Sequence, residues 1–351
     1  MEESKVKTLR ETLAERVLVL DGAMGTMIQR CGLQEKDFRS QRFASVTEVQ
    51  KGNNDLLCLT QPHIIADIHR LYLQAGADII ETCSFNSQVI SMADYGMQQI
   101  VEEINFAAAQ IARQEADAMT LINPSKPRYV VGSVGPTSKT ASLSPDMEDP
   151  AYRAVDFDQL AEAYTQQMKA LILGGVDALL IETIFDTLNA KAAIYAAKEA
   201  MRLTNKKVEI MLSATLSDKA GRTLSGQTID AFLTSVEHAN MLSIGLNCSF
   251  GATDMLPFLR ELSRLAPCYV SAYPNAGLPN AFGEYDETPH IMAAHIQPFL
   301  DEQLVNIIGG CCGTTPQHIA AFAPLAHKAT PRKPSTHDKK LHIAGLDALH
   351  I

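Results

Sequence analysis

A chain of 351 residues, 46% hydrophobic and 20% charged, has enough apolar material for one large buried core or two small ones. Its net charge of −10, with no lysine- or arginine-rich run, argues against nucleic acid as a partner. No apolar run approaches the roughly 18 residues that cross a bilayer. The charged residues 1–7 do not resemble a secretory signal, and seven cysteines without disulfide-scaffold spacing fit a reducing compartment. We therefore expect a cytoplasmic protein with no membrane partner.

Short apolar runs alternate with segments of helical period along the whole chain. We expect parallel strands, buried on both faces, at residues 17–21, 78–82, 129–134, 178–183, 209–215, 243–248, 269–273 and 305–310. Residues 62–75 show the intervening helical pattern, because Pro62 suits a first turn and Gly76 a helix stop. This alternation predicts an α/β fold, a single-domain (β/α)8 TIM barrel over residues 8–327. A doubly wound sheet would need a GxGxxG fingerprint after the first strand, which the sequence DGAMG at 21–25 does not match.

Acidic residues stand at the ends of three predicted strands, where a TIM barrel builds its active site. Asp21 and Glu182 could pair with a substrate ammonium group, and the backbone N–H groups of Gly22 and Ala23 could bind a carboxylate. A structural ion pair or a helix cap explains either acid equally well. Glu81 repeats the Glu182 pattern 101 positions earlier, and for it a structural role is the favoured interpretation.

Three cysteines follow the predicted sixth and eighth strands. Cys248 ends the sixth, and Cys311 and Cys312 stand in the glycine-rich sequence GGCCG at 309–313. Their side chains can converge over the barrel mouth, and three thiolates with an open fourth position suit a catalytic zinc ion. Buried packing or a disulfide between the neighbouring cysteines is the alternative. The remaining cysteines have no partner at ligand spacing and are expected to be buried or inert thiols: Cys31, Cys58, Cys83 and Cys268.

Three thiolates would leave a zinc centre with a net charge of −1, a weak Lewis acid. Such a centre is suited to binding a substrate thiol and removing its proton near neutral pH. A free thiol has a pKa of about 8.5 and is mostly protonated at pH 7. The predicted chemistry is therefore alkylation of a substrate sulfur, with the substrate thiolate as the nucleophile and no separate protein nucleophile.

Two further segments have a distinct composition. Residues 273–280 (YPNAGLPN) follow the predicted seventh strand and suit a rigid loop that contacts a ligand, although a simple turn has the same composition. Residues 328–351 are polar and broken by proline near their start. They are expected to form a linker or a tail on the barrel surface.

Five sequence motifs resemble the homocysteine-binding module of the cobalamin-dependent methionine synthase family. They are DGAMGT at 21–26, KGNND at 51–55, DTLNAK at 186–191, YPNAGLPN at 273–280 and GGCCGTTP at 309–316, and the resemblance extends over about residues 8–350. It implies zinc held by Cys248, Cys311 and Cys312, with homocysteine thiolate as incoming ligand. It also implies substrate contacts at Asp21, Gly22, Ala23 and Glu182, with Asn275 in the fourth zinc position when homocysteine is absent. The implied methyl donor is methylcobalamin, and the product is methionine.

The chain stops at Ile351, where that family continues into folate-binding and cobalamin-binding modules. We therefore expect either a fragment or one part of a split enzyme whose partner modules act in cis or in trans. One alternative is a stand-alone homocysteine methyltransferase that uses S-methylmethionine or betaine. Another is a non-catalytic zinc-stabilised scaffold, for which His318, in the helix after Cys312, would be the nearest candidate for a fourth ligand.

Overall fold

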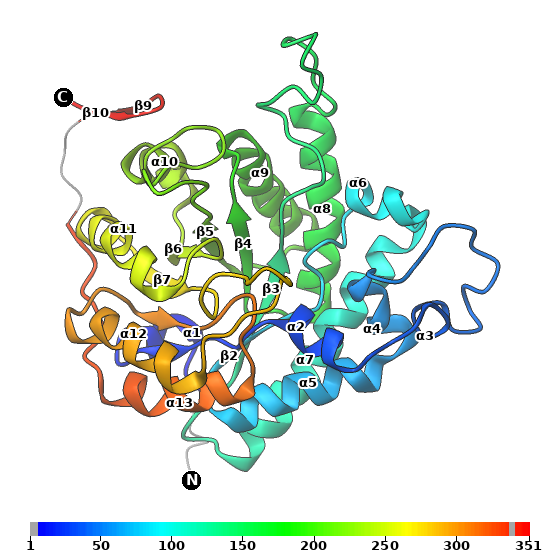
Figure 1. Cartoon of the computed structure of the whole chain (residues 1–351), viewed down its shortest axis with the longest axis horizontal. Coiled ribbons are helices and arrows are strands. Elements are labelled where there is room, and N and C mark those ends of the chain that lie inside the picture. Colours follow the sequence, from blue (N-terminus) through cyan, green and yellow to red (C-terminus); the bar gives the residue numbers. More distant parts are fainter. Residues whose placement is uncertain (1–5, 337–340) are drawn as a thin grey trace.

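Eight parallel strands form a barrel surrounded by helices in the computed structural model, which describes residues 6–336 and 341–351 (Figure 1). The strand order is β1-β8-β7-β6-β5-β4-β3-β2, and an isolated parallel bridge between Leu20 and Ile79 closes the ring between β1 and β2. The strands are β1 (Leu18–Val19), β2 (Ile79–Glu81), β3 (Tyr129–Val134), β4 (Ala178–Ile184), β5 (Glu209–Ala214), β6 (Ser243–Asn247), β7 (Tyr269–Tyr273) and β8 (Ile307–Ile308). The predicted (β/α)8 barrel is confirmed.

The predicted strands all exist, and β3 and β7 have the predicted bounds. The largest differences are at β1 and β8, which contain two residues each instead of five and six. Pairing continues irregularly beyond them, since the Gly310 N–H donates to the Asp21 carbonyl (3.2 Å). The two segments can approach closely because residue 309 is glycine. A Cβ at this position would lie 2.8 Å from the Leu20 Cβ. Gly309 is thus needed for space between the first and last strands.

Helices cover the outer face of the barrel. The principal ones are α5 (Pro62–Ala75), α7 (Val101–Ile122), α8 (Phe157–Gly174), α9 (Thr187–Thr204), α10 (Ile229–Val236), α11 (Ala252–Leu265), α12 (Pro289–Asp301) and α13 (Pro316–Lys328). Shorter ones are α1 (Leu9–Leu13), α2 (Met24–Arg30), α3 (Glu35–Arg39), α4 (Leu57–Thr60) and α6 (Val89–Met92). The α5 bounds match the sequence prediction, and Gly76 ends the helix in the left-handed conformation (φ 114°).

The strands are buried on both faces, as their apolar runs predicted. Leu18 and Leu20 point into the barrel interior, whereas Val17 and Val19 belong to the layer between strands and helices, which is the period-two alternation of a strand. Leu9 and Leu13 of α1 join the interior cluster. Helix α1 therefore closes the end of the barrel at which the strands begin. The other end stays free for loops that build a site.

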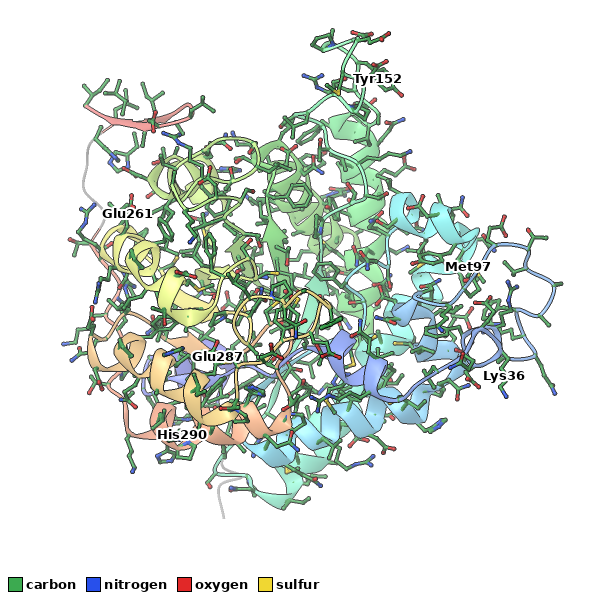
Figure 2. All side chains as sticks on the ribbon, viewed as in Figure 1. Lys36, Met97, Tyr152, Glu261, Glu287 and His290 are labelled. Atoms are coloured by element: carbon green, nitrogen blue, oxygen red, sulfur yellow. The ribbon has the colours of Figure 1, made fainter. Side chains whose placement is uncertain are left out.

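Residues 341–351 include a hairpin of β9 (His342–Ala344) and β10 (Ala348–His350). The hairpin lies against α10, where the Thr228 N–H donates to the Leu346 carbonyl (2.9 Å) and His350 Nε2 approaches Asp230 Oδ2 (2.7 Å). A second projection, between β3 and α8, carries Tyr152 near its tip (Figure 2). Within the described ranges, no helix has the length and apolarity that a membrane span requires.

Candidate active site

A cavity of about 780 Å³ opens at the ends of the strands. Seven of the nine residues predicted for the site line it, namely Gly22, Ala23, Glu81, Glu182, Cys248, Cys311 and Cys312. The other two, Asp21 and Asn275, are buried next to lining residues, at 2% and 3% exposure. The strand ends therefore bring together residues that are up to 291 positions apart along the chain, from Asp21 to Cys312.

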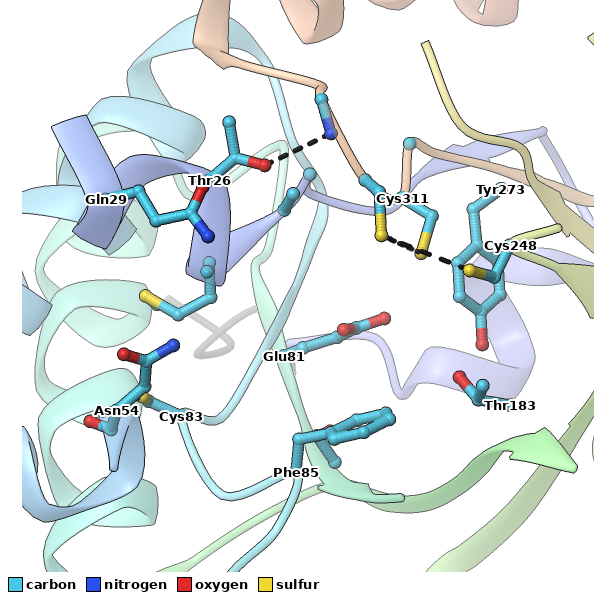
Figure 3. Close-up of a pocket in the computed structure, with 18 of the residues that line it drawn as sticks. Thr26, Gln29, Asn54, Glu81, Cys83, Phe85, Thr183, Cys248, Tyr273 and Cys311 are labelled. Atoms are coloured by element: carbon cyan, nitrogen blue, oxygen red, sulfur yellow. Dashed lines mark hydrogen bonds between the residues drawn. The ribbon is translucent and has the colours of Figure 1, made fainter. Parts of the chain in front are cut away.

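Three cysteine sulfurs form a compact group on one side of this cavity (Figure 3). The Cys312 Sγ lies 4.0 Å from both the Cys248 Sγ and the Cys311 Sγ, and all three lie within 4.8 Å of one another. Thiolates at the Zn–S distance of about 2.3 Å in a tetrahedron would be about 3.8 Å apart. The spacing of the three sulfurs therefore fits a tetrahedral metal ion with one position left for another ligand.

Backbone conformation at the end of β6 aims Cys248 into the cavity. Cys248 and Ser249 both have φ 58°, and Thr183 at the end of β4 has φ 55°, values that are uncommon outside glycine. The Asn247 side chain joins these two strand ends, because its Oδ1 accepts from the Thr183 N–H (3.1 Å) and its Nδ2 donates to the Thr183 Oγ1 (2.9 Å). Ser213 on β5 donates to the same Oδ1 (2.7 Å). A buried amide thus supports the strained turn before the cysteine.

The adjacent cysteines are held by the loop that follows β7. The Cys311 N–H donates to the Pro274 carbonyl (2.8 Å), and the Cys312 N–H donates to the Asn275 Oδ1 (3.1 Å). Gly313 then has φ 81°, which lets the chain turn away directly after Cys312. The Asn275 side-chain oxygen is therefore engaged by the backbone of one cysteine, and the Asn275 backbone N–H donates to the Phe250 carbonyl two residues after Cys248 (3.0 Å).

The three thiols differ in pKa. Hydrogen bonds from Cys311 and Cys312 lower the pKa of Cys248 to about 3. The same contacts with Cys248 raise the pKa of Cys311 and of Cys312, since ionisation of either would place a second negative charge beside the first. The group therefore holds one thiolate at neutral pH, and a bound cation would be needed to ionise the other two.

Two carboxyl groups, those of Glu81 and Glu182, line the same cavity, and Asp21 is buried next to lining residues. Glu182 accepts a short hydrogen bond from the Ser133 hydroxyl and a longer one from the Tyr273 hydroxyl (3.4 Å), and its burial raises its pKa to about 7. Burial also raises the pKa of Asp21 and of Glu81 well above the usual range, the nearby Glu182 raises both further, and Asp21 adds to the rise at Glu81. Asp21 Oδ2 accepts from the Glu81 N–H (3.1 Å), but its Oδ1 is buried without a protein partner. This arrangement is suited to a ligand that brings a positive charge.

Sequence reasoning missed several residues that shape the site. Ser133 and Tyr273 hold Glu182, and Tyr285 lines the cavity beside the cysteines. Ser133 and Tyr273 lie within predicted strands. The alternation of side chains along each strand, which points them toward the barrel interior, was the signal that could have identified them. The Ala23 N–H, expected to bind a substrate carboxylate, donates to the Thr314 Oγ1 (3.1 Å) in this structure.

The remaining cysteines lie outside the three-sulfur group. Cys58 and Cys83 are buried, Cys268 is half-buried and Cys31 is exposed. Cys83 lines the cavity, where a hydrogen bond with Cys58 and burial raise its pKa well above the usual range. His318, the candidate fourth ligand of a closed site, is buried in α13, where its Nδ1 lies 2.9 Å from the Thr315 Oγ1. Its other ring nitrogen lies 2.9 Å from the Glu287 carbonyl oxygen, so it is engaged away from the sulfurs.

Residues 18–325 match the family described as homocysteine S-methyltransferase. Solved structures of the homocysteine methyltransferase MmuM from Escherichia coli have a similar fold. The metallated form has a TM-score of 0.69 at 22% identity, covering 90% of this chain and 99% of that chain. The oxidised form has a TM-score of 0.69 at 22% identity, covering 88% and 95%. The apo form has a TM-score of 0.63 at 20% identity, covering 91% and 99%. At these identities the solved structures show the fold.

Proposed function

Since the chain belongs to the homocysteine S-methyltransferase family, we propose that it uses zinc to activate homocysteine as a thiolate for methylation to methionine. The observation that carries this proposal is the spacing of the Cys248, Cys311 and Cys312 sulfurs, within 4.8 Å of one another at the wall of a cavity. Three thiolates with an open fourth side are a donor set for zinc that accepts a substrate ligand. Bound zinc would lower the pKa of the substrate thiol and hold it as the nucleophile.

The acids of the cavity would orient the amino-acid part of the substrate. Glu182, fixed by Ser133 and Tyr273, is placed to accept hydrogen bonds from the substrate ammonium group, together with Asp21 and Glu81. The positive charge would relieve the mutual repulsion that raises the pKa values of these carboxyls. The N–H groups near Gly22 and Ala23 would receive the carboxylate, once the Thr314 hydroxyl gives up its bond to Ala23.

Asn275 has a different role in this proposal from that of a simple metal ligand. Its side-chain oxygen accepts from the Cys312 N–H and its backbone N–H donates to the Phe250 carbonyl, so it links the two cysteine segments. To occupy the fourth metal position when homocysteine is absent, the side chain would have to release the Cys312 N–H. Replacement of Asn275 by homocysteine would then restore that hydrogen bond.

Methylcobalamin is the methyl donor that we propose, presented by a cobalamin-binding module in cis or in trans and recharged through a folate-binding module. The support is the set of long motifs that resemble the cobalamin-dependent methionine synthase family. A sulfonium or betaine donor is the second candidate. One observation favours it: Phe85 and Tyr285 both line the cavity, and aromatic faces bind sulfonium and quaternary ammonium cations.

Turnover by the purified zinc-loaded chain tests the proposal. The chain is incubated anaerobically with homocysteine and with methylcobalamin, S-methylmethionine or betaine in turn, each carrying a deuterated methyl group, and labelled methionine is measured by mass spectrometry. Methionine from methylcobalamin alone supports the proposed donor, and methionine from a sulfonium or betaine alone rejects it. If zinc is bound but homocysteine changes neither turnover nor the sulfur coordination seen by X-ray absorption, the chain is a zinc-stabilised scaffold.

A further inference from the structure

Three side-chain amides line the cavity away from the sulfurs. They belong to Gln29 of α2, to Asn54 in a short 3₁₀ turn at residues 54–56, and to Asn86 in the loop after β2. Figure 3 shows Gln29 and Asn54 on one side of the cavity and Cys311 on the other. We call these three side chains the amide group. The cavity therefore has walls of two different chemical kinds.

A buried carboxylate brings two of these amides together. Asp55 directly follows Asn54, and its Oδ2 accepts from the Asn86 N–H (2.7 Å). On the side of the helix, a Cβ at Gly25 would lie 3.7 Å from the Asn54 Nδ2. Gly25 and Gln29 are four residues apart, so they lie on one face of α2. The amide group is therefore contiguous, although its members come from three separate segments.

The fold does not use the hydrogen-bonding capacity of the amide group. Within the part of the chain that the structure describes, the side chains of Gln29, Asn54 and Asn86 form no hydrogen bond. Two amides beside the sulfurs, those of Asn247 and Asn275, are by contrast engaged by backbone N–H groups. Each carboxamide offers an acceptor oxygen and two donor hydrogens. The amide group thus presents donors and acceptors that a polar ligand could take up.

The charge beside the amide group differs from that beside the sulfurs. The Asp55 carboxylate is occupied, because its Oδ2 also accepts from the Ser87 hydroxyl (2.9 Å) and its Oδ1 lies 3.8 Å from the Cys83 Sγ. Among the described residues that line the cavity, Arg30 is the only arginine or lysine. It is exposed and forms no ion pair with any described residue. This wall is suited to neutral or anionic groups, whereas cations prefer carboxylates and aromatic faces.

The size of the cavity leaves room for more than homocysteine. The cavity measures about 780 Å³, and sites for drug-sized ligands typically measure about 300–1,000 Å³. Homocysteine is a small amino acid, and in the proposed function the sulfurs and acids hold it at one wall. The remaining space, which the amide group lines, would then be open to the methyl donor.

We propose that the amide group is a subsite for a methyl donor that carries several carboxamides, as the corrin ring of methylcobalamin does. The inference rests on the proposed function, because it assumes that the donor meets homocysteine in this cavity. Carboxamides pair with one another, since each has an N–H donor and a C=O acceptor. Arg30 would bind an anionic group of the same ligand, such as a phosphate. A small sulfonium or betaine carries no carboxamide and would leave the amide group hydrated.

Binding of cyanocobalamin tests the subsite without turnover, because this corrinoid has the same carboxamides but no methyl group to transfer. Equilibrium dialysis against the zinc-loaded chain with homocysteine measures its affinity by absorbance. We expect Gln29→Ala and Asn86→Ala each to weaken binding about 5-fold, the usual effect of losing one neutral hydrogen bond. Gln41→Ala is the matched control, since Gln41 is exposed and does not line the cavity. It should bind cyanocobalamin as the unchanged chain does.

Kinetics with free methylcobalamin give a second measurement. The KM for methylcobalamin should rise in Gln29→Ala and Asn86→Ala, whereas the KM for homocysteine should not change. Unchanged corrinoid affinity in both variants, or no corrinoid binding by the unchanged chain, overturns the inference. An equal rise in the KM for homocysteine would also overturn it, because the amides would then serve the amino acid. Circular dichroism confirms that each variant is folded.

Failure of the subsite and failure of the proposed function are distinguishable. Zinc content and the sulfur coordination seen by X-ray absorption on addition of homocysteine are measured without any corrinoid. A chain that binds zinc and homocysteine but no corrinoid contradicts only the subsite. A chain that binds no zinc at the three cysteines contradicts the proposed function itself.

Discussion

Buried acidic residues at the two ends of the barrel differ in whether a basic side chain pairs with them. At the end where strands begin, Asp78 is buried at 1% exposure but accepts two hydrogen bonds from Arg16 (3.0 and 2.8 Å) and one from the Val19 N–H (3.0 Å). At the end where strands finish, Asp21 is buried to a similar extent and none of the described arginines or lysines forms an ion pair with it. A buried aspartate is therefore neutralised by the fold at one rim, and at the other rim it has no basic partner among the described residues.

Helix direction helps to explain the contrast. Helices of a β/α barrel end at the rim where strands begin, and their last carbonyls attract cations. Lys126 shows this, because its Nζ donates to the Gly76 carbonyl at the end of α5 (2.9 Å) and lies 3.3 Å from an Asp78 oxygen. Acids at that rim find partners in the fold itself. At the opposite rim, beside the three sulfurs, a cationic substrate group would supply that partner in the function that we propose.

Cys311→Ala is the change with the largest expected effect, and it acts at the end of the barrel where the strands finish. Zinc-binding free energies of about 12 kcal/mol shared among three or four ligands give about 4 kcal/mol per ligand, or about 10³-fold in affinity. We expect the variant to lose its zinc, measured by elemental analysis of anaerobically purified protein, and to lose homocysteine methylation. Cys31→Ala, at an exposed thiol, is the matched control. A full equivalent of zinc in Cys311→Ala would contradict the three-sulfur site.

Arg16→Met should lower the stability of the fold at the end of the barrel where the strands begin, and leave the three-cysteine site at the other end unchanged. Removing the guanidinium leaves Asp78 buried with Lys126 alone, and breaking a buried ion pair typically costs about 3 kcal/mol of unfolding free energy. Urea denaturation measures this loss, while zinc content should not change. Arg42→Met removes an exposed ion pair with Glu103 and should cost less than about 1 kcal/mol. Equal losses in both variants would show that burial of Asp78 does not matter.

The unpaired acids predict a smaller, pH-dependent effect on the metal-free protein. The pKa of Glu182 is raised to about 7 in the folded state, so the fold keeps a proton that the unfolded chain releases near pH 4.5. Stability from the neutral carboxyl is complete below about pH 4.5 and is lost as the pH rises through about 7. The unfolding free energy should fall by about 1.4 kcal/mol per pH unit for this group.

Glu182→Gln should remove that part of the slope, as measured by urea denaturation between pH 5 and pH 7. Glu103→Gln is the control, because pairing with Arg42 lowers the pKa of Glu103 and places its titration below this range. A slope unchanged by Glu182→Gln would mean that Glu182 is ionised in the folded protein throughout, which would remove the contrast between the two rims.

The sequence alone determined the barrel, the order of its strands and the positions of the cysteines and acids at the strand ends. Strand and helix periods are local properties, so short windows were sufficient to predict β3, β7 and α5 with the bounds that the structure has. The convergence of Cys248 with Cys311 and Cys312 followed from the geometry of the fold class, because every parallel strand finishes at the same rim.

Only the tertiary structure decided which groups surround each of these residues. Ser133 and Tyr273 reach Glu182 from 49 and 91 positions away, and no local pattern marks a hydrogen bond over such separations. The close approach of Tyr285 to Gly313 likewise depends on the path of a loop and on the absence of a side chain at Gly313. Side-chain partners are chosen by packing after the strands have assembled, so they cannot be inferred from the chemical character of one segment.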